Sequence, residues 1–261
     1  YVHIDFGLDS DERTAAMYQR PFEHIRGSVR ADRHATRTTA PAWWRHERPR
    51  PEMRGALRGL PRFIVTPTVA RHRTFVWLQH PVLPDHQGIV FARSDDYAFG
   101  VLHSRVHEAW ALRKASKLRI DFRYTPSSTF ETFPFPWPLN LPPDRLSPAQ
   151  RGYSDGISSA ARELVVARDR WLNPPELLRE EPDVVPTLPP RRLPVSDEAA
   201  RVLKGRTLTK LYNERPAWLD MLHRALDRAV LAAYDWPADI GEDELLQRLL
   251  RLNHLRTATR A

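Results

Sequence analysis

The sequence predicts an α+β fold, in which a mixed α/β part with a short-stranded sheet is followed by a helical C-terminal segment. Short β-branched and aromatic runs separated by turn residues lie between residues 62 and 102. From residue 147 onward, apolar residues recur at helical spacing instead. We therefore divide the chain into residues 1–138 and residues 139–261.

The N-terminal region predicts a strand and then helices. Residues 2–6 alternate enough for a strand, and Ser10 is a plausible N-cap for a helix that reaches residue 18. The apolar spacing continues to residue 29. Residues 30–58 are rich in arginine and proline, which indicates short helix and ordered loop.

The centre of the chain is the most sheet-like part. Turn residues separate four runs with strand character, which are residues 62–69, 74–78, 88–92 and 97–102. Ser104 can then cap a helix that carries apolar residues from Val106 to Trp110.

A stiff aromatic segment follows at residues 123–138. Phenylalanine or tryptophan alternates with proline from Phe133 to Pro138. Proline fixes φ and lacks an N–H group, so this run must be extended or polyproline-like. Such a segment suits either a docking peptide for a partner or a rigid crossover between two parts of the fold.

The C-terminal half predicts three longer helices. Ser147 followed by proline is a good N-cap for the first, whose apolar stripe reaches Trp171. Residues 174–194 hold seven prolines and predict a linker or extended wrap. Pro216 opens the second helix, and residues 242–255 form the third.

Composition limits the class of protein. The 261 residues are 41% hydrophobic and include no cysteine, which excludes disulfides and thiolate zinc sites. No apolar run approaches twenty residues, so we expect a cytoplasmic protein without a membrane span. The opening strand-like residues lack an initiator Met, and we interpret the chain as a fragment of a longer polypeptide.

The charge is strongly basic and unevenly distributed. The net charge is +8, and arginine supplies all but four of the 40 basic residues. Arginine bias can reflect genome composition, so position is the better guide. Residues 20–73 hold thirteen arginines and four acids, whereas residues 176–200 hold six acids and three arginines. Such segregation favours a polyanionic partner on one face.

Motifs for catalysis or cofactor binding are weak. Asn173-Pro174-Pro175-Glu176 is similar to the motif of amino-methyltransferases that act on DNA bases, but Glu176 replaces the aromatic residue and the motif follows a helix. It predicts a helix end with a proline stop. No glycine-rich loop follows a strand, and His103 and His107 lack the carboxylate of a zinc hydrolase. We predict no catalytic residue and no metal site in this chain.

Residues 105–123 are a candidate nucleic-acid-binding segment. They hold six basic residues and two acids, interleaved with Trp110 and Phe122. Arginine pairs with phosphates and with guanine edges, while aromatic rings stack on bases or support a loop. Composition alone does not separate DNA from RNA.

Nearly the whole chain resembles one family in collinear order. The most specific blocks are residues 95–112 and 123–138, and further matches are residues 4–7, 20–23, 43–51, 60–67, 69–78 and 211–237. The sequence resembles the C-terminal target recognition region of MmeI-like (Type IIL/IIG) adenine-specific DNA methyltransferases of restriction–modification systems.

The resemblance implies a module that recognises double-stranded DNA. In that family, an upstream domain of the same polypeptide binds S-adenosylmethionine and methylates adenine, and some members add a Mg²⁺-dependent nuclease. This chain matches only the recognition portion, so we expect no cofactor in it and no catalysis by it alone. The resemblance also favours a rigid crossover with buried rings at residues 130–138.

Candidate DNA-contacting residues follow from the basic turns and the basic segment. We expect phosphate and base contacts from Arg71, His72, Arg73, Arg93, Arg105, Lys114, Lys117, Arg119, Arg123 and Tyr124. The alternative is a stand-alone, non-catalytic protein that binds DNA or RNA, or that recruits partners through its proline–aromatic segments.

Overall fold

The computed structural model describes residues 4–30, 33, 42–114, 116–118, 121–183 and 189–258, although the side chains of residues 116–118 and 121 are not among the features described. The chain forms two compact units, Tyr1–Gly59 and Leu60–Ala261. The boundary predicted after residue 138 falls inside the second unit. Each unit is described by itself.

The first unit is small and helical. It contains α1 (Glu12–Ala16), α2 (Gln19–Ser28) and α4 (Pro51–Leu57). Ala15, Phe22 and Trp43 form its core. The N-cap of α1 is Asp11, one residue after the predicted Ser10. Residues 4–6 are not a strand, and Phe6 contacts the ring of Phe22 at 6.3 Å between centroids.

The second unit contains two three-stranded antiparallel sheets and a hairpin. The first sheet has the order β3-β1-β4, with β1 (Arg62–Pro67) between β3 (Val76–Gln79) and β4 (Gly88–Phe91). The second has the order β2-β6-β5, with β2 (Val69–Ala70), β6 (Asp121–Arg123) and β5 (Ser116–Leu118). The predicted strands at 62–69, 74–78 and 88–92 are confirmed within a few residues.

The fourth predicted strand, residues 97–102, is wrong. These residues belong to helix α5 (Asp96–His103), and all six are buried. A helix buried on every side has no polar face, so its periodicity does not distinguish it from a buried strand. The available signal was Asp95, whose Oδ1 accepts the N–H of Ala98 at 2.8 Å as an N-cap.

Helices dominate the remainder of the second unit, as predicted. Helix α8 begins with a capping box in which Ser147 and Gln150 bind each other's backbone N–H. The helices are α6 (Arg105–Lys114), α7 (Pro126–Thr129), α8 (Pro148–Leu172), α9 (Asp197–Lys204), α10 (Leu208–Glu214), α11 (Ala217–Ala233) and α12 (Glu242–Ala258). The proline-rich stretch contains the hairpin β7 (Leu178–Glu181) and β8 (Arg191–Pro194).

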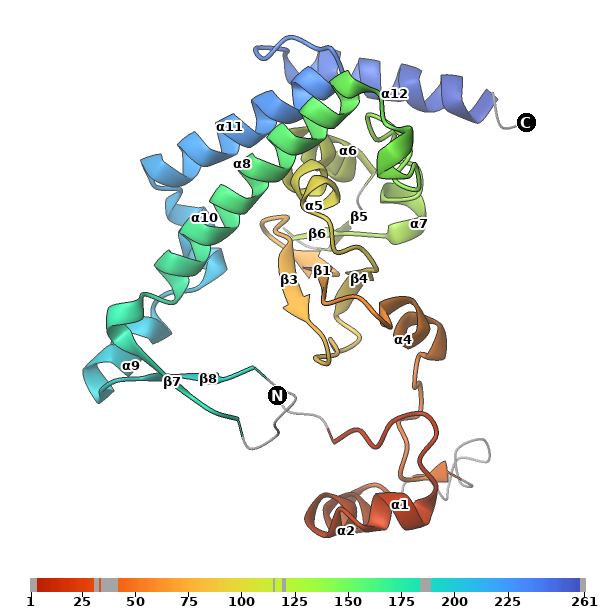
Figure 1. The fold of residues 1–261 in the computed structure, drawn as a ribbon, viewed down its shortest axis with the longest axis vertical. Coiled ribbons are helices and arrows are strands. Elements are labelled where there is room, and N and C mark those ends of the chain that lie inside the picture. The colour runs from red at the N-terminus through yellow and green to blue at the C-terminus, as the bar shows by residue number, and fades with distance from the viewer. Residues whose placement is uncertain are drawn as a thin grey trace. The chain divides into compact units, whose positions relative to one another are not determined.

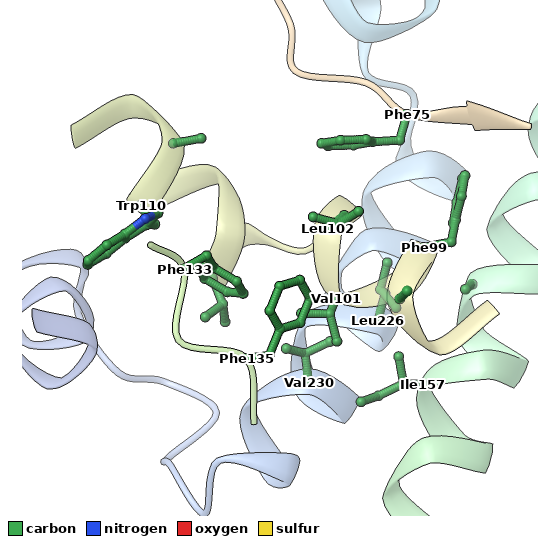
Figure 2. Packing of buried hydrophobic residues seen from close by; sticks show 14 of the residues in the cluster. Phe75, Phe99, Val101, Leu102, Trp110, Phe133, Phe135, Ile157, Leu226 and Val230 are labelled. Carbon is green, nitrogen blue, oxygen red and sulfur yellow. The ribbon is translucent and has the colours of Figure 1, made fainter. Parts of the chain in front are cut away.

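One hydrophobic core joins the sheet-bearing part to the C-terminal helices. Figure 1 shows α8 and α11 side by side, with α5 next to them. In Figure 2, Phe75 and Phe99 lie on one side of this core and Ile157 of α8 on another. Side chains of α11, including Leu226, complete it.

The proline–aromatic segment is part of the same core. Residues 133–138 form neither helix nor strand, and the rings of Phe133, Phe135 and Trp137 are buried. Trp137 stacks on Tyr97 with 4.8 Å between ring centroids. The prediction that these rings are buried is confirmed, and they are not displayed to solvent.

None of the helices among the described residues combines the length and the apolar character that a bilayer crossing requires.

Helices α5 and α8 approach so closely that a side chain at residue 100 has no room. A Cβ placed on Gly100 would lie 2.6 Å from Cγ2 of Ile157 and 3.2 Å from Cβ of Ala161. Both neighbours are buried side chains of α8. Glycine at this position therefore sets the distance between the two helices.

We expect Gly100→Ala to destabilise the second unit by roughly 1–3 kcal/mol, because the added methyl forces α5 and α8 apart. Urea unfolding followed by tryptophan fluorescence measures the change. Gly152→Ala, in an exposed part of α8 where no atom lies within 4 Å of the new Cβ, is the matched control. The control gains about 0.5–1 kcal/mol from helix propensity. Equal stabilisation of both variants would contradict the tight contact.

Candidate nucleic-acid interface

The candidate interface lies at the edge strand of the second sheet. Strand β2 ends at Ala70, and the loop Arg71-His72-Arg73 follows directly. Strand β6 pairs with β2 so that Val69 faces Arg123 and Ala70 faces Phe122. The pairing brings two predicted DNA-contacting segments, which are distant in the sequence, into one sheet.

Arg73 fixes the loop from within. Its Nη1 donates to Oγ1 of Thr66 at 3.2 Å and to the carbonyl of Pro67, and its Nη2 donates to the carbonyl of Phe122 at 2.8 Å. The guanidinium carbon lies 5.2 Å from the ring centroid of Tyr124. Burial lowers the pKa of Arg73 from its ordinary value. Most of its hydrogen-bonding capacity therefore joins β1 to β6.

Arg71 and Arg123 are the accessible cations of this edge. Both side chains are exposed, and neither forms a hydrogen bond or ion pair with other residues in the described ranges. Arg71 directly follows β2, and Arg123 pairs with Val69 of β2, two residues before Arg71. Two unpaired guanidinium groups, one in the loop after β2 and one on β6, suit a polyanion.

Tyr124 lies in the core beneath this edge. Only 2% of its surface is exposed, and its hydroxyl lies 3.0 Å from Nε2 of His107. The carbonyl of Leu102 accepts from Nδ1 of His107, so Nε2 accepts the Tyr124 hydroxyl proton. Burial lowers the pKa of His107 to about 3, so the ring is neutral. The structure thus gives Tyr124 a supporting position rather than an exposed one.

His72 connects the loop to the C-terminal helices. Its Nε2 lies 2.7 Å from Oδ1 of Asn213, near the end of α10. Its ring lies 6.0 Å from the ring of Tyr212. Asn213 is 141 positions away in sequence and was not among the predicted residues. No local sequence signal identifies it, because only the tertiary fold brings α10 to the loop.

A buried polar cluster lies next to this connection. The hydroxyl of Tyr212 is 2.9 Å from Nε2 of His103, 3.2 Å from Nη1 of Arg168 and 3.0 Å from Nε2 of His223. Nδ1 of His103 accepts the N–H of Phe75 at 3.2 Å, and its Nε2 lies 2.9 Å from both the Tyr212 hydroxyl and Nη1 of Arg168. Burial lowers the pKa of His103 well below its ordinary value and that of His223 to about 4. The cluster holds the ring of Tyr212 in place.

The other predicted contact residues lie elsewhere. Arg93 donates from Nε to Asp95 at 2.7 Å and from Nη1 to the carbonyl of Leu139 at 2.8 Å. Lys114 is exposed, with Nζ 5.0 Å from the ring centroid of Trp110. The side chain of Lys117, on β5, and the whole of Arg119 lie outside the described residues.

Arg105 is bound to the C-terminal helices. Its backbone N–H donates to Oδ1 of Asp227 at 2.7 Å, and its Nη2 donates to the carbonyls of Ala238 and Ile240 at 3.3 and 3.1 Å. Burial raises the pKa of Asp227 to about 6, against an ordinary value of 3.8. Among the described residues, the hydrogen bonds of Arg105 lead to Asp227, Ala238 and Ile240 and not to Arg71 or Arg123.

Within the described ranges, no three His, Asp or Glu side chains gather in a way that could hold a metal ion. His103 and His107, the histidine pair with helical spacing, each use both ring nitrogens in hydrogen bonds. Asn173 ends α8, and its Nδ2 donates to Asp169 at 2.8 Å. The helix end with a proline stop, predicted from Asn173-Pro174-Pro175, is confirmed.

Comparisons with known proteins agree with this fold. The family model of the MmeI target recognition domain matches residues 10–137. This part of the chain is therefore similar to MmeI target recognition domains. DNA methyltransferase A of Bacillus subtilis (strain 168) is 28% identical over 158 residues, which are 60% of this chain and 13% of that protein.

A solved structure shares the fold over almost the whole chain. It is the Type IIL restriction–modification enzyme MmeI in complex with DNA, which matches with a TM-score of 0.54 and 15% identity over 95% of this chain. The match covers 25% of the MmeI chain. This chain therefore spans only a small part of the proteins that it resembles.

The burial of Asp227, which raises its pKa, predicts a pH-dependent stability. Above pH 6, Asp227 is ionised in both the folded and the unfolded protein, and the buried charge lowers the free energy of unfolding. We expect Asp227→Asn to be more stable than wild type by only roughly 1–2 kcal/mol at pH 8, because solvent near the partly exposed carboxylate screens its charge. Asparagine still offers Oδ1 to the N–H of Arg105.

The advantage of Asp227→Asn should shrink as the pH falls from 6 to 4, since the folded wild type takes up the proton first. Urea unfolding at several pH values measures this difference. Asp155→Asn, on an exposed position of α8, removes the same charge and should show no such dependence. If the difference in the free energy of unfolding between Asp227→Asn and wild type stayed the same at every pH, the pKa of Asp227 would not be raised.

Proposed function

We propose that this chain is the sequence-specific, duplex-DNA-binding module of a restriction–modification DNA adenine-N6 methyltransferase. The observation that carries the proposal is the pair of exposed guanidinium groups, Arg71 in the loop after edge strand β2 and Arg123 on the adjacent strand β6. Arg73 holds this edge rigid beneath them. The match of residues 10–137 to the MmeI target recognition domain and the fold shared with a DNA-bound enzyme support it.

Each part of the edge has a different task. Arg71 and Arg123 bind phosphates and steer association, which makes affinity fall steeply with salt. Polar side chains beside them read base edges in the major groove. In the longer protein, this grip presents a flipped adenine to a catalytic domain that binds S-adenosylmethionine. Mg²⁺ is needed only where a nuclease domain is also present.

The position of the proline–aromatic segment disfavours the rival function of partner recruitment. A docking peptide must expose the side chains that its partner binds. Phe133, Phe135 and Trp137 are instead between 5% and 7% exposed. An RNA-binding role differs from the proposal in its preferred ligand and is separated by experiment.

We expect Arg71→Ala and Arg123→Ala each to weaken binding to all duplex sequences. Each substitution should also make the slope of log affinity against log salt concentration shallower by about 1, because one phosphate contact is lost. Salt titrations of duplex DNA binding by fluorescence anisotropy measure both effects. Single-stranded DNA and RNA of the same sequence serve as competitors.

Arg151 is an exposed arginine on α8, away from the sheet edge in sequence. Arg151→Ala should leave the salt slope unchanged. If all three variants changed the slope equally, the binding would not be localised to the sheet edge. If wild-type protein bound duplex DNA no better than RNA at physiological salt, target recognition would be the wrong function.

The methyltransferase assignment predicts a methylation pattern in the host genome. We expect deletion of the gene to remove N6-methyladenine from one short sequence motif and to leave other motifs methylated. Single-molecule sequencing of genomic DNA with and without the gene measures this loss. Restoring the intact gene is the control, and an unchanged pattern in the deletion strain would contradict the assignment.

A further inference from the structure

Asn213 is placed to act together with the loop at the sheet edge. It is an exposed residue near the C-terminal end of α10, and its Oδ1 lies 2.7 Å from Nε2 of His72. His72 is flanked by the exposed Arg71 and the anchored Arg73. We propose that Asn213 determines sequence specificity by reading one base edge of the DNA, an inference that rests on the proposed function.

The hydrogen bond to His72 fixes the direction of the amide. An amide oxygen only accepts, so Nε2 of His72 carries the proton. The Nδ2 group of Asn213 then carries two N–H donors that have no partner among the described residues. The side chain therefore presents an oriented donor next to His72, in the loop that also carries Arg71.

The support for this orientation is rigid on both sides. The His72 ring lies against Tyr212, the residue before Asn213, and the Tyr212 hydroxyl is held by His103 and Arg168. On the other side, Arg73 anchors the loop to β1 and β6. A group held in this way loses little conformational entropy on binding, which is the condition for selective recognition.

A donor-only amide restricts the bases that it can read. Acceptors in the major groove are purine N7, guanine O6 and thymine O4, whereas cytosine presents the N4 amino donor. The usual two-bond contact of asparagine with adenine also needs a free amide oxygen, which His72 occupies here. Asn213 thus selects an acceptor edge and rejects cytosine at that position.

A base contact is favoured over a phosphate contact by the neighbours of Asn213. Arg71 and Arg123 already supply unpaired positive charge for phosphates at this edge. A neutral amide adds little attraction to a phosphate compared with a guanidinium group. Its value lies in direction, which is what recognition of a base edge requires.

The test is the base preference of wild type and variants, measured by selection from a library of randomised duplexes. We expect Asn213→Ala to lose discrimination at a single base pair by roughly 5- to 100-fold, the range that a good base contact supplies. Asn213→Asp replaces the donor by an acceptor and should shift the preference there toward cytosine. Asn140→Ala, at another exposed asparagine, should keep the wild-type preference.

His72 acts as a positioning residue, and its variants test that role. His72→Ala should lower discrimination at the same base pair, because the amide loses its orientation. His72→Gln places an amide donor near the position of Nε2 and should restore most of the discrimination. Circular dichroism of each variant checks that the fold is intact.

Two outcomes would overturn the inference while leaving the proposed function standing. In the first, Asn213→Ala keeps the wild-type preference at every base pair. In the second, Asn213→Ala weakens binding to all duplex sequences equally, as loss of a phosphate contact would. Failure of wild-type protein to prefer duplex DNA over RNA would instead reject the proposed function itself.

Discussion

The buried guanidinium of Arg168 is the interaction on which the second unit depends. The side chain extends from α8, is only 4% exposed, and donates to the carbonyl of Phe75 at 2.9 Å and to the hydroxyl of Tyr212. It therefore links the long C-terminal helix to the chain that enters β3 and to α10. Burying a cation is costly unless its donors find acceptors, and although Nε of Arg168 has no partner among the described residues, the bonds from Nη1 and Nη2 require these segments to stay together.

The sheet edge that we propose binds DNA inherits its rigidity from that cluster. Tyr212, held by Arg168 and His103, supports His72 from below, while Tyr124, held by His107, supports the guanidinium of Arg73. Both histidines are kept neutral by burial, which lowers their pKa values. The exposed groups that we propose contact DNA thus stand on two buried tyrosine–histidine pairs whose protonation does not change near neutral pH.

Local signals in the sequence were sufficient for much of this fold. Ser147-Pro148 identified the start of α8, and β-branched and aromatic runs between turn residues identified three strands, because caps and strand composition are local features of the sequence. The missed helix α5 is buried all round and shows no period. Arg71 and Arg73 look alike in sequence, and only strand pairing makes one exposed and the other an anchor. Arg168 interrupted an apolar helical stripe, which was a readable sign of a buried polar cluster.

The glycine at position 100 has a consequence for building hybrid proteins. Helix α5 packs against α8 at Gly100 with no room for a side chain between them. The surface of α5 and the surface of α8 are therefore specifically complementary. A graft that transferred only the residues up to 138 would separate complementary surfaces and leave Ile157 and Leu226 facing foreign helices. A hybrid protein should therefore receive residues 60–261 as one piece, so that the strands keep the C-terminal helices against which they pack.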